Sequence, residues 1–260
     1  MNKQKQKRRD DRLRDDALET YINSISDLLL DKSLSILAKQ KARGTLDTEQ
    51  QDFLDAGIDV IRAKTLLIFR KFKNDEHSNR SDSECKGSIL LFLYETGLIR
   101  DQKVNDQGQE DTEPKHFQAL LSLFRADLSF TSLSDTDLSG VNLFAANLSY
   151  ADLSNSDLSN SDFSNSDLTH SDFSDANLSD ADLSGAILLA VDLSQTKHLT
   201  QEQLEVEEPP LLCKVKLPKD IKVDPNRDCK NLPEVLQERD LERFEDLEEA
   251  QAYVDKLSKP

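Results

Sequence analysis

A five-residue repeat from Ala126 to Gln195 constrains the fold of this chain more than any other feature. Fourteen units follow one another without an insertion, each with a small residue first, usually Asp or Asn second, Leu or Phe third and mostly Ser fourth. A period of five matches neither the 3.6 residues of a helical turn nor the alternation of a strand. It predicts a solenoid, in which each unit buries its apolar residue against copies of itself.

The first and third positions of the repeat carry the candidate core. The third position is Leu in twelve units and Phe at Phe163 and Phe173, while the first position holds only Ala, Val, Ser or Thr. One large and one small inward-facing class are what a narrow, filled tube requires. The remaining positions are mainly Asp, Asn, Ser and Gly, so we expect them to face water.

Units such as Ala151-Asp152-Leu153-Ser154-Asn155 resemble the A(D/N)LXX units of the pentapeptide-repeat family. The resemblance covers 70 of the 260 residues and implies a right-handed quadrilateral β-helix with four units per coil. Residues twenty apart would then stack at about 4.8 Å, and fourteen units would make about three and a half coils, roughly 17 Å long. With helices expected before the repeats, the predicted fold class is α+β.

The flanking sequence is divided by composition and periodicity. An amphipathic helical pattern begins near Asp11, Thr48 and Gln51 form a predicted capping box, and Ser83 is a predicted helix cap. We expect His116–Phe124 to cover the first coil and Leu241–Leu257 to be helical. The predicted organisation is a basic polar tail (1–9), an α-helical region (10–99), a linker (100–114), the capped β-helix (115–200) and a Pro-containing tail that ends in a helix (201–260).

Segments outside the repeat add a second resemblance. The stretch KGSILLFLYETGLI in the helical region and PPLLCKVKLP in the tail resemble the flanks of many cyanobacterial pentapeptide-repeat proteins. Several of those relatives carry a membrane-spanning helix further upstream. No run in this chain approaches the roughly 20 apolar residues of such a helix, so we expect a soluble, cytoplasmic protein.

The repeat carries most of the net charge of the chain. It contains twelve Asp and no Lys or Arg, against a formal charge of −17 for all residues. Some members of the resembled family bind DNA gyrase by imitating duplex DNA, but a rod of about 17 Å would imitate only about five base pairs. A solvated sheath that keeps the rod from aggregating is therefore the favoured interpretation, and no direct nucleic-acid binding is expected.

Residue patterns that support catalysis or cofactor binding are missing from the sequence. The four His lie in separate segments, no CxxC motif occurs, and the seven Gly form no phosphate-binding loop. Cys213 and Cys229 could meet in a folded tail, although three Cys without a signal peptide indicate reduced thiols. We expect no enzyme, no cofactor and no metal.

Recognition residues are expected where the repeat departs from its own pattern. Apolar side chains occupy outward positions at Phe130, Phe144, Tyr150, Ile187 and Leu189. They either pack against the flanking regions or form a patch that binds a partner. The stacking rule also aligns three acidic residues in one column, and the predicted partner-binding residues are Phe130, Phe144, Tyr150, Asp152, Asp172 and Asp192.

The sequence therefore predicts a non-enzymatic pentapeptide-repeat protein that binds an unidentified protein partner or acts as a scaffold. One alternative is a DNA mimic that binds DNA gyrase or another topoisomerase. The other is a membrane-associated accessory protein whose basic segment Lys3–Arg14 makes a peripheral contact with the lipid surface.

Overall fold

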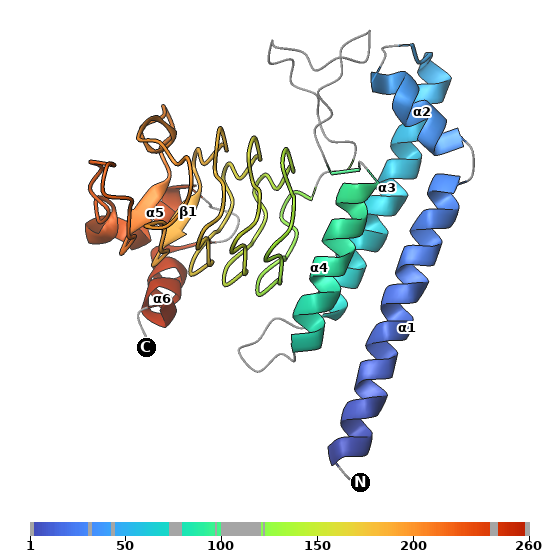
Figure 1. Ribbon diagram of the computed structural model, residues 1–260, viewed down its shortest axis with the longest axis horizontal. Helices are drawn as coiled ribbons and strands as arrows, with labels where there is room; N and C mark the ends of the chain where they lie inside the picture. The colour runs from blue at the N-terminus through green and yellow to red at the C-terminus, as the bar shows by residue number, and fades with distance from the viewer. Residues whose placement is uncertain are drawn as a thin grey trace.

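A helical region and a small tail cover the two ends of a rod made by the repeats (Figure 1). The computed structural model describes residues 3–30, 33–42, 45–72, 80–96, 98–99, 121, 123–239 and 244–257. Four helices, α1 (Lys3–Leu30), α2 (Ser33–Ala42), α3 (Thr48–Lys71) and α4 (Arg80–Glu95), precede the rod. The other elements are β1 (Ile187–Leu189), η1 (Glu202–Leu204), β2 (Leu211–Cys213), η2 (Cys229–Asn231), α5 (Leu232–Arg239) and α6 (Leu247–Leu257).

Parallel bridges between residues twenty apart define the coils of the rod. Asp127 pairs with Asn147, and Asn147 pairs in turn with Asp167, with the same spacing on the other faces. Around Asn147 the backbone N–H of Leu128 donates to the Asn147 carbonyl at 2.8 Å, and the Asn147 N–H donates to the Ala126 carbonyl at 2.9 Å. The backbone of each coil is thus hydrogen-bonded to the coil before it and to the coil after it, as the period predicted.

Tight turns at positions four and five of the units make the corners of the rod. Position-five residues in most units have a positive φ, for example 60° at Tyr150 and 59° at His170. Asn, Asp and Gly tolerate this left-handed conformation best, which accounts for their frequency there. The Asp or Asn at position two accepts a hydrogen bond from the backbone N–H two residues later, at 3.0 Å for Asp157 and Ser159. Much of the acidic sequence therefore stabilises the turns.

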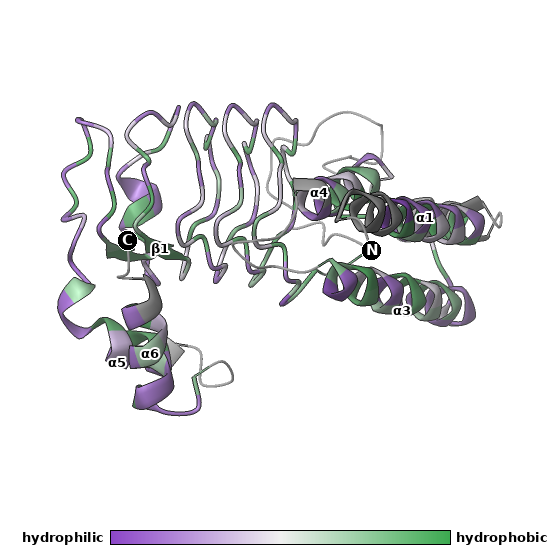
Figure 2. Cartoon of the chain, turned by 90° about the horizontal axis from the view of Figure 1, so that it is seen from below, coloured by the Kyte–Doolittle hydropathy of each residue, from purple (hydrophilic) through white to green (hydrophobic). Residues whose placement is uncertain are grey.

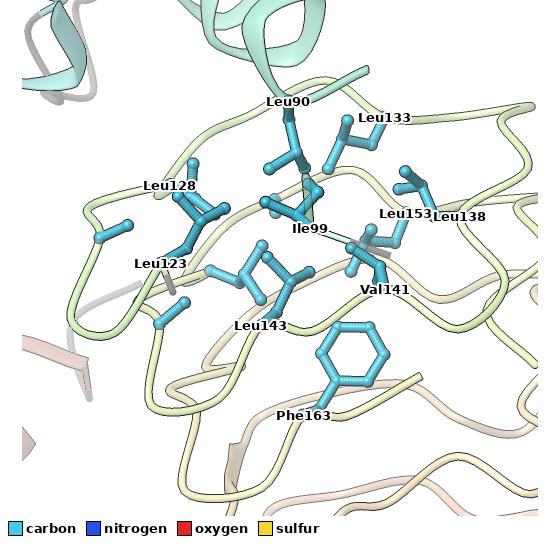
Figure 3. Close-up of a cluster of buried hydrophobic side chains, with 14 of the residues drawn as sticks. Leu90, Ile99, Leu123, Leu128, Leu133, Leu138, Val141, Leu143, Leu153 and Phe163 are labelled. Carbon is cyan, nitrogen blue, oxygen red and sulfur yellow. The ribbon is translucent and has the colours of Figure 1, made fainter. Parts of the chain in front are cut away.

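The interior of the rod is a continuous column of apolar side chains. All fourteen third-position residues are buried, as are the small residues at almost every first position. Leucines from successive coils point toward one another, with Phe163 below them (Figure 3). Hydrophobic and hydrophilic residues alternate along the trace of each coil (Figure 2), and the Leu and Phe residues among them are the buried ones.

Helix α4 covers the open edge of the first coil. The Nζ of Lys86 donates to the carbonyl oxygens of Asp127 and Ser129, at 3.1 and 3.3 Å, and the Tyr94 hydroxyl donates to the Ser139 carbonyl at 3.0 Å. Gly87 packs directly on the backbone of the first coil. Side chains of the helix thus bond to carbonyls that a preceding coil would otherwise pair, which prevents end-to-end association.

Lys86 makes the stability of this cap depend on pH. Its side chain is only 1% exposed, and burial lowers the pKa of Lys86 to about 8, although the Asp127 carboxylate opposes the shift. Above about pH 8 the folded protein releases this proton, whereas the unfolded chain keeps it until about pH 10.4. The unfolded state then binds more protons, so the contribution of Lys86 to stability rises with pH in this window.

We expect Lys86→Met to remove that rise. Urea unfolding of the wild type and the variant between pH 7.5 and 9.5 should show a gap in unfolding free energy that widens with pH in favour of the wild type. Comparing the two proteins cancels the opposite slope from the buried Cys85 thiol, whose pKa is raised by burial. A pH-independent gap would contradict the titration of Lys86 in the folded state.

The tail adds part of one further coil at the other end. Strand β2 pairs in parallel with β1, with Leu189 opposite Cys213. The Gln203 side chain donates to the carbonyls of Leu178 and Ala181, both at 2.8 Å, and so covers the exposed edge of the last coil. Gln203 belongs to the single turn η1.

Cys213 and Cys229 form a disulfide, so the expectation of three reduced thiols is wrong for this pair. The strand pairing of β2 and the turn of η2 bring the two residues together, which the linear sequence does not reveal. Cys85, the third cysteine, is free and buried in α4. The disulfide fastens the α5–α6 region to the last turn of the rod.

Several predicted boundaries differ from the structure. Helix α1 begins at Lys3 instead of near Asp11. The α3 capping box uses Asp47 and Gln50, one residue earlier than predicted. Ser83 lies inside α4, where its hydroxyl donates to the Phe130 carbonyl instead of capping the helix.

The tail and the linkers differ in the same way. The expected helix 241–257 is represented by α6, which begins at Leu247 and is preceded by α5. The predicted linker 100–114 and the predicted cap residues 116–120 lie outside the described residues, while Leu121 and Leu123 are buried at the first coil as expected. Among the described helices, none is long and apolar enough to cross a membrane.

Candidate partner-binding surface

Three aromatic side chains form a ladder along one corner of the rod. The rings of Phe130 and Tyr150 stack with centroids 4.8 Å apart and 1° between their planes, and His170 stacks on Tyr150, also at 4.8 Å. This separation is the coil spacing itself, because the three residues occupy the same position in successive coils. Tyr150 is 38% exposed, so the ladder offers an aromatic surface to solvent.

A second aromatic pair stands on the preceding corner. Phe144 stacks on Phe124 with centroids 5.8 Å apart, and the Arg125 guanidinium lies 5.2 Å from the Phe124 ring centroid. Phe124 and Phe144 are 37% and 38% exposed. They are twenty residues apart, like the members of the ladder. Two consecutive corners of the rod therefore present aromatic rings, with one face between them.

Helix α6 covers the part of that face that lies away from α4. The Tyr253 hydroxyl donates to the Asp167 carboxylate at 2.9 Å. Ile187 and Leu189 are buried against the tail in a small core with Phe244, which confirms packing against a flanking region for these two outward residues. The aromatic residues Phe130, Tyr150 and Phe144 stack on other rings.

The acidic column lies on the face that follows the ladder. Bridges join Asp152 to Asp172 and Asp172 to Asp192, which places the three in line as the period predicted. The Ser154 and Ser174 hydroxyls each donate to the carboxylate of their own unit at 2.6 Å. Lys216 donates to Asp192 at 2.7 Å, and mainly this bond lowers the pKa of Asp192 to about 2. The column is thus partly neutralised at its end.

All six predicted residues consequently lie on neighbouring corners and faces of the rod. The place of His170, which is half-buried in the ladder, was not predicted from the sequence. The twenty-residue step from Tyr150 to His170 was the signal that would have identified it. Phe124 was not predicted either. It precedes the recognisable repeat but continues the same twenty-residue spacing.

Nothing in the described part of the chain resembles a metal or catalytic centre. No group of three or more His, Cys, Asp or Glu residues there is arranged to hold a metal ion. An open hollow of about 610 Å³ lies beside Asp180, Asp182, Glu207 and Glu208. It has no buried base or nucleophile, and general acid or base chemistry requires a positioned group of suitable pKa.

Comparisons with known proteins identify the repeat. The family model for pentapeptide repeats matches in eight copies over residues 122–160 and 161–197. Among solved structures, the pentapeptide-repeat protein alr5209 from Nostoc PCC 7120 is 31% identical; the match covers 38% of this chain and 78% of that one, with a TM-score of 0.34. No match was found among curated proteins.

Two further solved structures are cyanobacterial. Rfr23 from Cyanothece 51142, a pentapeptide-repeat protein, is 27% identical over 45% of this chain and 71% of its own, with a TM-score of 0.30. HetL, a Nostoc PCC 7120 pentapeptide-repeat protein involved in heterocyst differentiation regulation, is 24% identical. The match covers 39% of this chain and 48% of that one, with a TM-score of 0.29. The match to the repeat model and the 31% identity to alr5209 over 78% of that protein agree with the unbroken register of buried Leu and Phe. They establish that this chain belongs to the pentapeptide-repeat family.

Proposed function

We propose that this protein binds another protein through the aromatic ladder and serves as a rigid, non-enzymatic scaffold. The rod would be a right-handed quadrilateral β-helix of about three and a half coils. The observation that carries the proposal is the Phe130–Tyr150–His170 stack, in which large rings remain partly exposed on a surface otherwise made of Asp, Asn and Ser. Exposed aromatic groups held rigid by stacking are typical anchors of protein interfaces.

Charge around the ladder narrows the kind of partner. The adjacent column of Asp152 and Asp172 gives the neighbouring face negative charge, so a partner with basic groups beside an apolar or aromatic patch fits best. The DNA-mimic alternative gains less from this arrangement, because the position-two carboxylates are engaged in their own turns and the rod is short. The Cys213–Cys229 disulfide favours an oxidising compartment over the expected cytoplasm.

We expect Tyr150→Ser combined with Phe130→Ser to lower the capture of the partner at least about tenfold, as for anchor residues in other interfaces. The full chain, immobilised, would be exposed to an extract of its source cells, and the bound proteins quantified by mass spectrometry. Phe53→Ser is the matched control, because Phe53 is an aromatic residue that is 56% exposed and belongs to α3, outside the rod.

A protein retained by the wild type and by the Phe53 control, but lost from the ladder variant, would support the proposal. An identical set of captured proteins for all three baits would refute it. Thermal unfolding of each bait shows whether the ladder variant still folds.

A further inference from the structure

The helical region contains a groove that the function of the rod does not use. It has a volume of about 650 Å³ and runs between α1 and α3. Helix α1 lies on the side of the helical region farthest from the rod (Figure 1), so this groove and the aromatic ladder are separate surfaces. Its lining residues are Leu13, Asp16, Ala17, Thr20, Tyr21, Ser24, Lys64, Leu67, Ile68, Arg70 and Lys71.

The walls of the groove are unusually apolar for a solvent-facing position. Leu13 of α1 is 58% exposed and Leu67 of α3 is 60% exposed, and both line the groove. Its floor is formed by the buried Tyr21 and Ile68. The Tyr21 hydroxyl is hydrogen-bonded to Thr65 at 2.7 Å, which joins α1 to α3 below the floor. The groove is therefore a fixed apolar channel between two joined helices.

Its rim is positively charged in a protein that is acidic overall. Lys64, Arg70 and Lys71 line the groove and are exposed, whereas Asp16 is the one carboxylate among the lining residues. Within the described part of the chain, none of these three cations forms an ion pair or a side-chain hydrogen bond. The whole chain has a formal charge of −17, most of which the repeat carries, so the positive charge of the groove contrasts with the acidic rod and adds to that of the basic segment Lys3–Arg14.

We propose that the groove binds an acidic amphipathic α-helix of a partner protein. The lining positions on α1 extend from residue 13 to residue 24, which corresponds to about 17 Å, or about three turns of a helix. Apolar side chains of the partner at i, i+3 or i+4 and i+7 would contact Leu13, Leu67 and Ile68. Its Glu or Asp residues would meet the three cations at the rim.

Two other occupants fit the groove less well. A second copy of this chain docked groove to groove would bring its own three cations against those already present, which is unfavourable when like charges meet. A lipid surface would attract the cations, but a flat bilayer cannot reach the floor formed by Tyr21 and Ile68. The concave shape together with the basic rim therefore favours a helix over both.

The test uses two synthetic helical peptides of about 15 residues with the same leucine-rich face, one flanked by Glu and the other by Lys. Binding of the full-length protein to each labelled peptide is followed by fluorescence anisotropy. We expect the acidic peptide to bind the wild type about fivefold to tenfold more tightly than the basic one at low salt, since the rim charges act at the surface. Arg70→Glu with Lys71→Glu should reverse this preference.

Two further variants distinguish binding in the groove from nonspecific adsorption of the peptide. Leu67→Asp should weaken the acidic peptide at least about tenfold by placing a charge in the apolar channel, while Phe53→Asp, another exposed apolar position of α3, should leave binding unchanged. Tyr150→Ser should also leave it unchanged, so that failure here and failure of the ladder proposal remain distinguishable.

Equal affinity of the wild type for both peptides, or loss with Phe53→Asp, would overturn the proposal. So would dimerisation that is abolished by Leu67→Asp, which would assign the groove to a second copy. Salt-sensitive binding to vesicles of phosphatidylcholine and phosphatidylserine, without peptide binding, would assign the surface to membranes.

Discussion

Gly87→Ala is expected to lower the free energy of unfolding by about 2 kcal/mol, as overpacking in a close contact does. A Cβ at this position would overlap the backbone carbonyl oxygen of Ser132 in the first coil. A backbone atom held in the coil cannot move aside as a flexible side chain can. Helix α4 would have to shift, and the bonds from Lys86 and Tyr94 to the coil would lengthen with it.

The chain contains a matched control for this substitution. Gly57 lies inside α3, and the atoms nearest to a Cβ there are the two methyl groups and the Cγ of Leu34, the far end of a side chain that can rotate. Gly57→Ala should therefore be close to neutral, because alanine favours a helix over glycine by up to about 1 kcal/mol. Denaturant unfolding of both variants measures the difference. Equal effects at the two positions would contradict the close packing of α4 on the rod.

Cap displacement should also change the association state of the protein. The first coil presents unpaired backbone groups once α4 moves away, and exposed strand edges template the pairing of chains. Sedimentation of Gly87→Ala at increasing concentration should reveal assemblies that Gly57→Ala does not form. The cap is thus expected to contribute both to stability and to the monomeric character of the rod.

Phe163→Ala should have the largest effect, about 3–5 kcal/mol, the range measured for such truncations in protein cores. Phe163 and Phe173 meet edge to face inside the rod, with centroids 6.3 Å apart and 82° between their planes, and both are fully buried. The removed ring would leave a cavity inside a narrow tube, where hydrogen-bonded coils on either side restrict collapse.

Phe163→Leu is the conservative counterpart, because Leu occupies the third position in twelve of the fourteen units. It should cost less than about 1.5 kcal/mol, as volume-conserving changes usually do. Calorimetry or denaturant unfolding of both variants measures these effects. If the Ala and Leu variants lost equal stability, the cavity would not be the cause, because both variants lack the edge-to-face contact with Phe173 and only the Ala variant leaves a large cavity.

The interior of the rod could be predicted from the sequence almost residue by residue. The five-residue period fixes which side chains face inward, and equivalent residues of each unit pack in the same way in every coil. The Asp column followed from the same rule. Ile187 and Leu189 were identified as exceptions, but their burial depends on a tail that contacts them only in three dimensions.

The caps and the tail could not be predicted in the same way. Lys86 looks like an ordinary solvent-facing lysine of an amphipathic helix, because its partners are backbone carbonyls about forty residues away. Cys213 and Cys229 are joined by the path of the chain between them. The first turns of α1 carry almost no apolar side chains, so hydrophobic periodicity cannot indicate that they are helical. Asp47 and Thr48 are both good caps, and local chemistry alone does not choose between them.

The twenty-residue step of the aromatic ladder has a consequence for how such a chain can change by duplication or deletion. Inserting one five-residue unit between Tyr150 and His170 would keep every Leu inside the tube but rotate His170 by one corner, away from Tyr150. Inserting four units would restore the corner and lengthen the rod by one coil. The core therefore tolerates any number of added units, whereas an added coil keeps the aromatic ladder continuous only if it carries a ring at the same position, because Tyr150 and His170 stack as residues one coil apart.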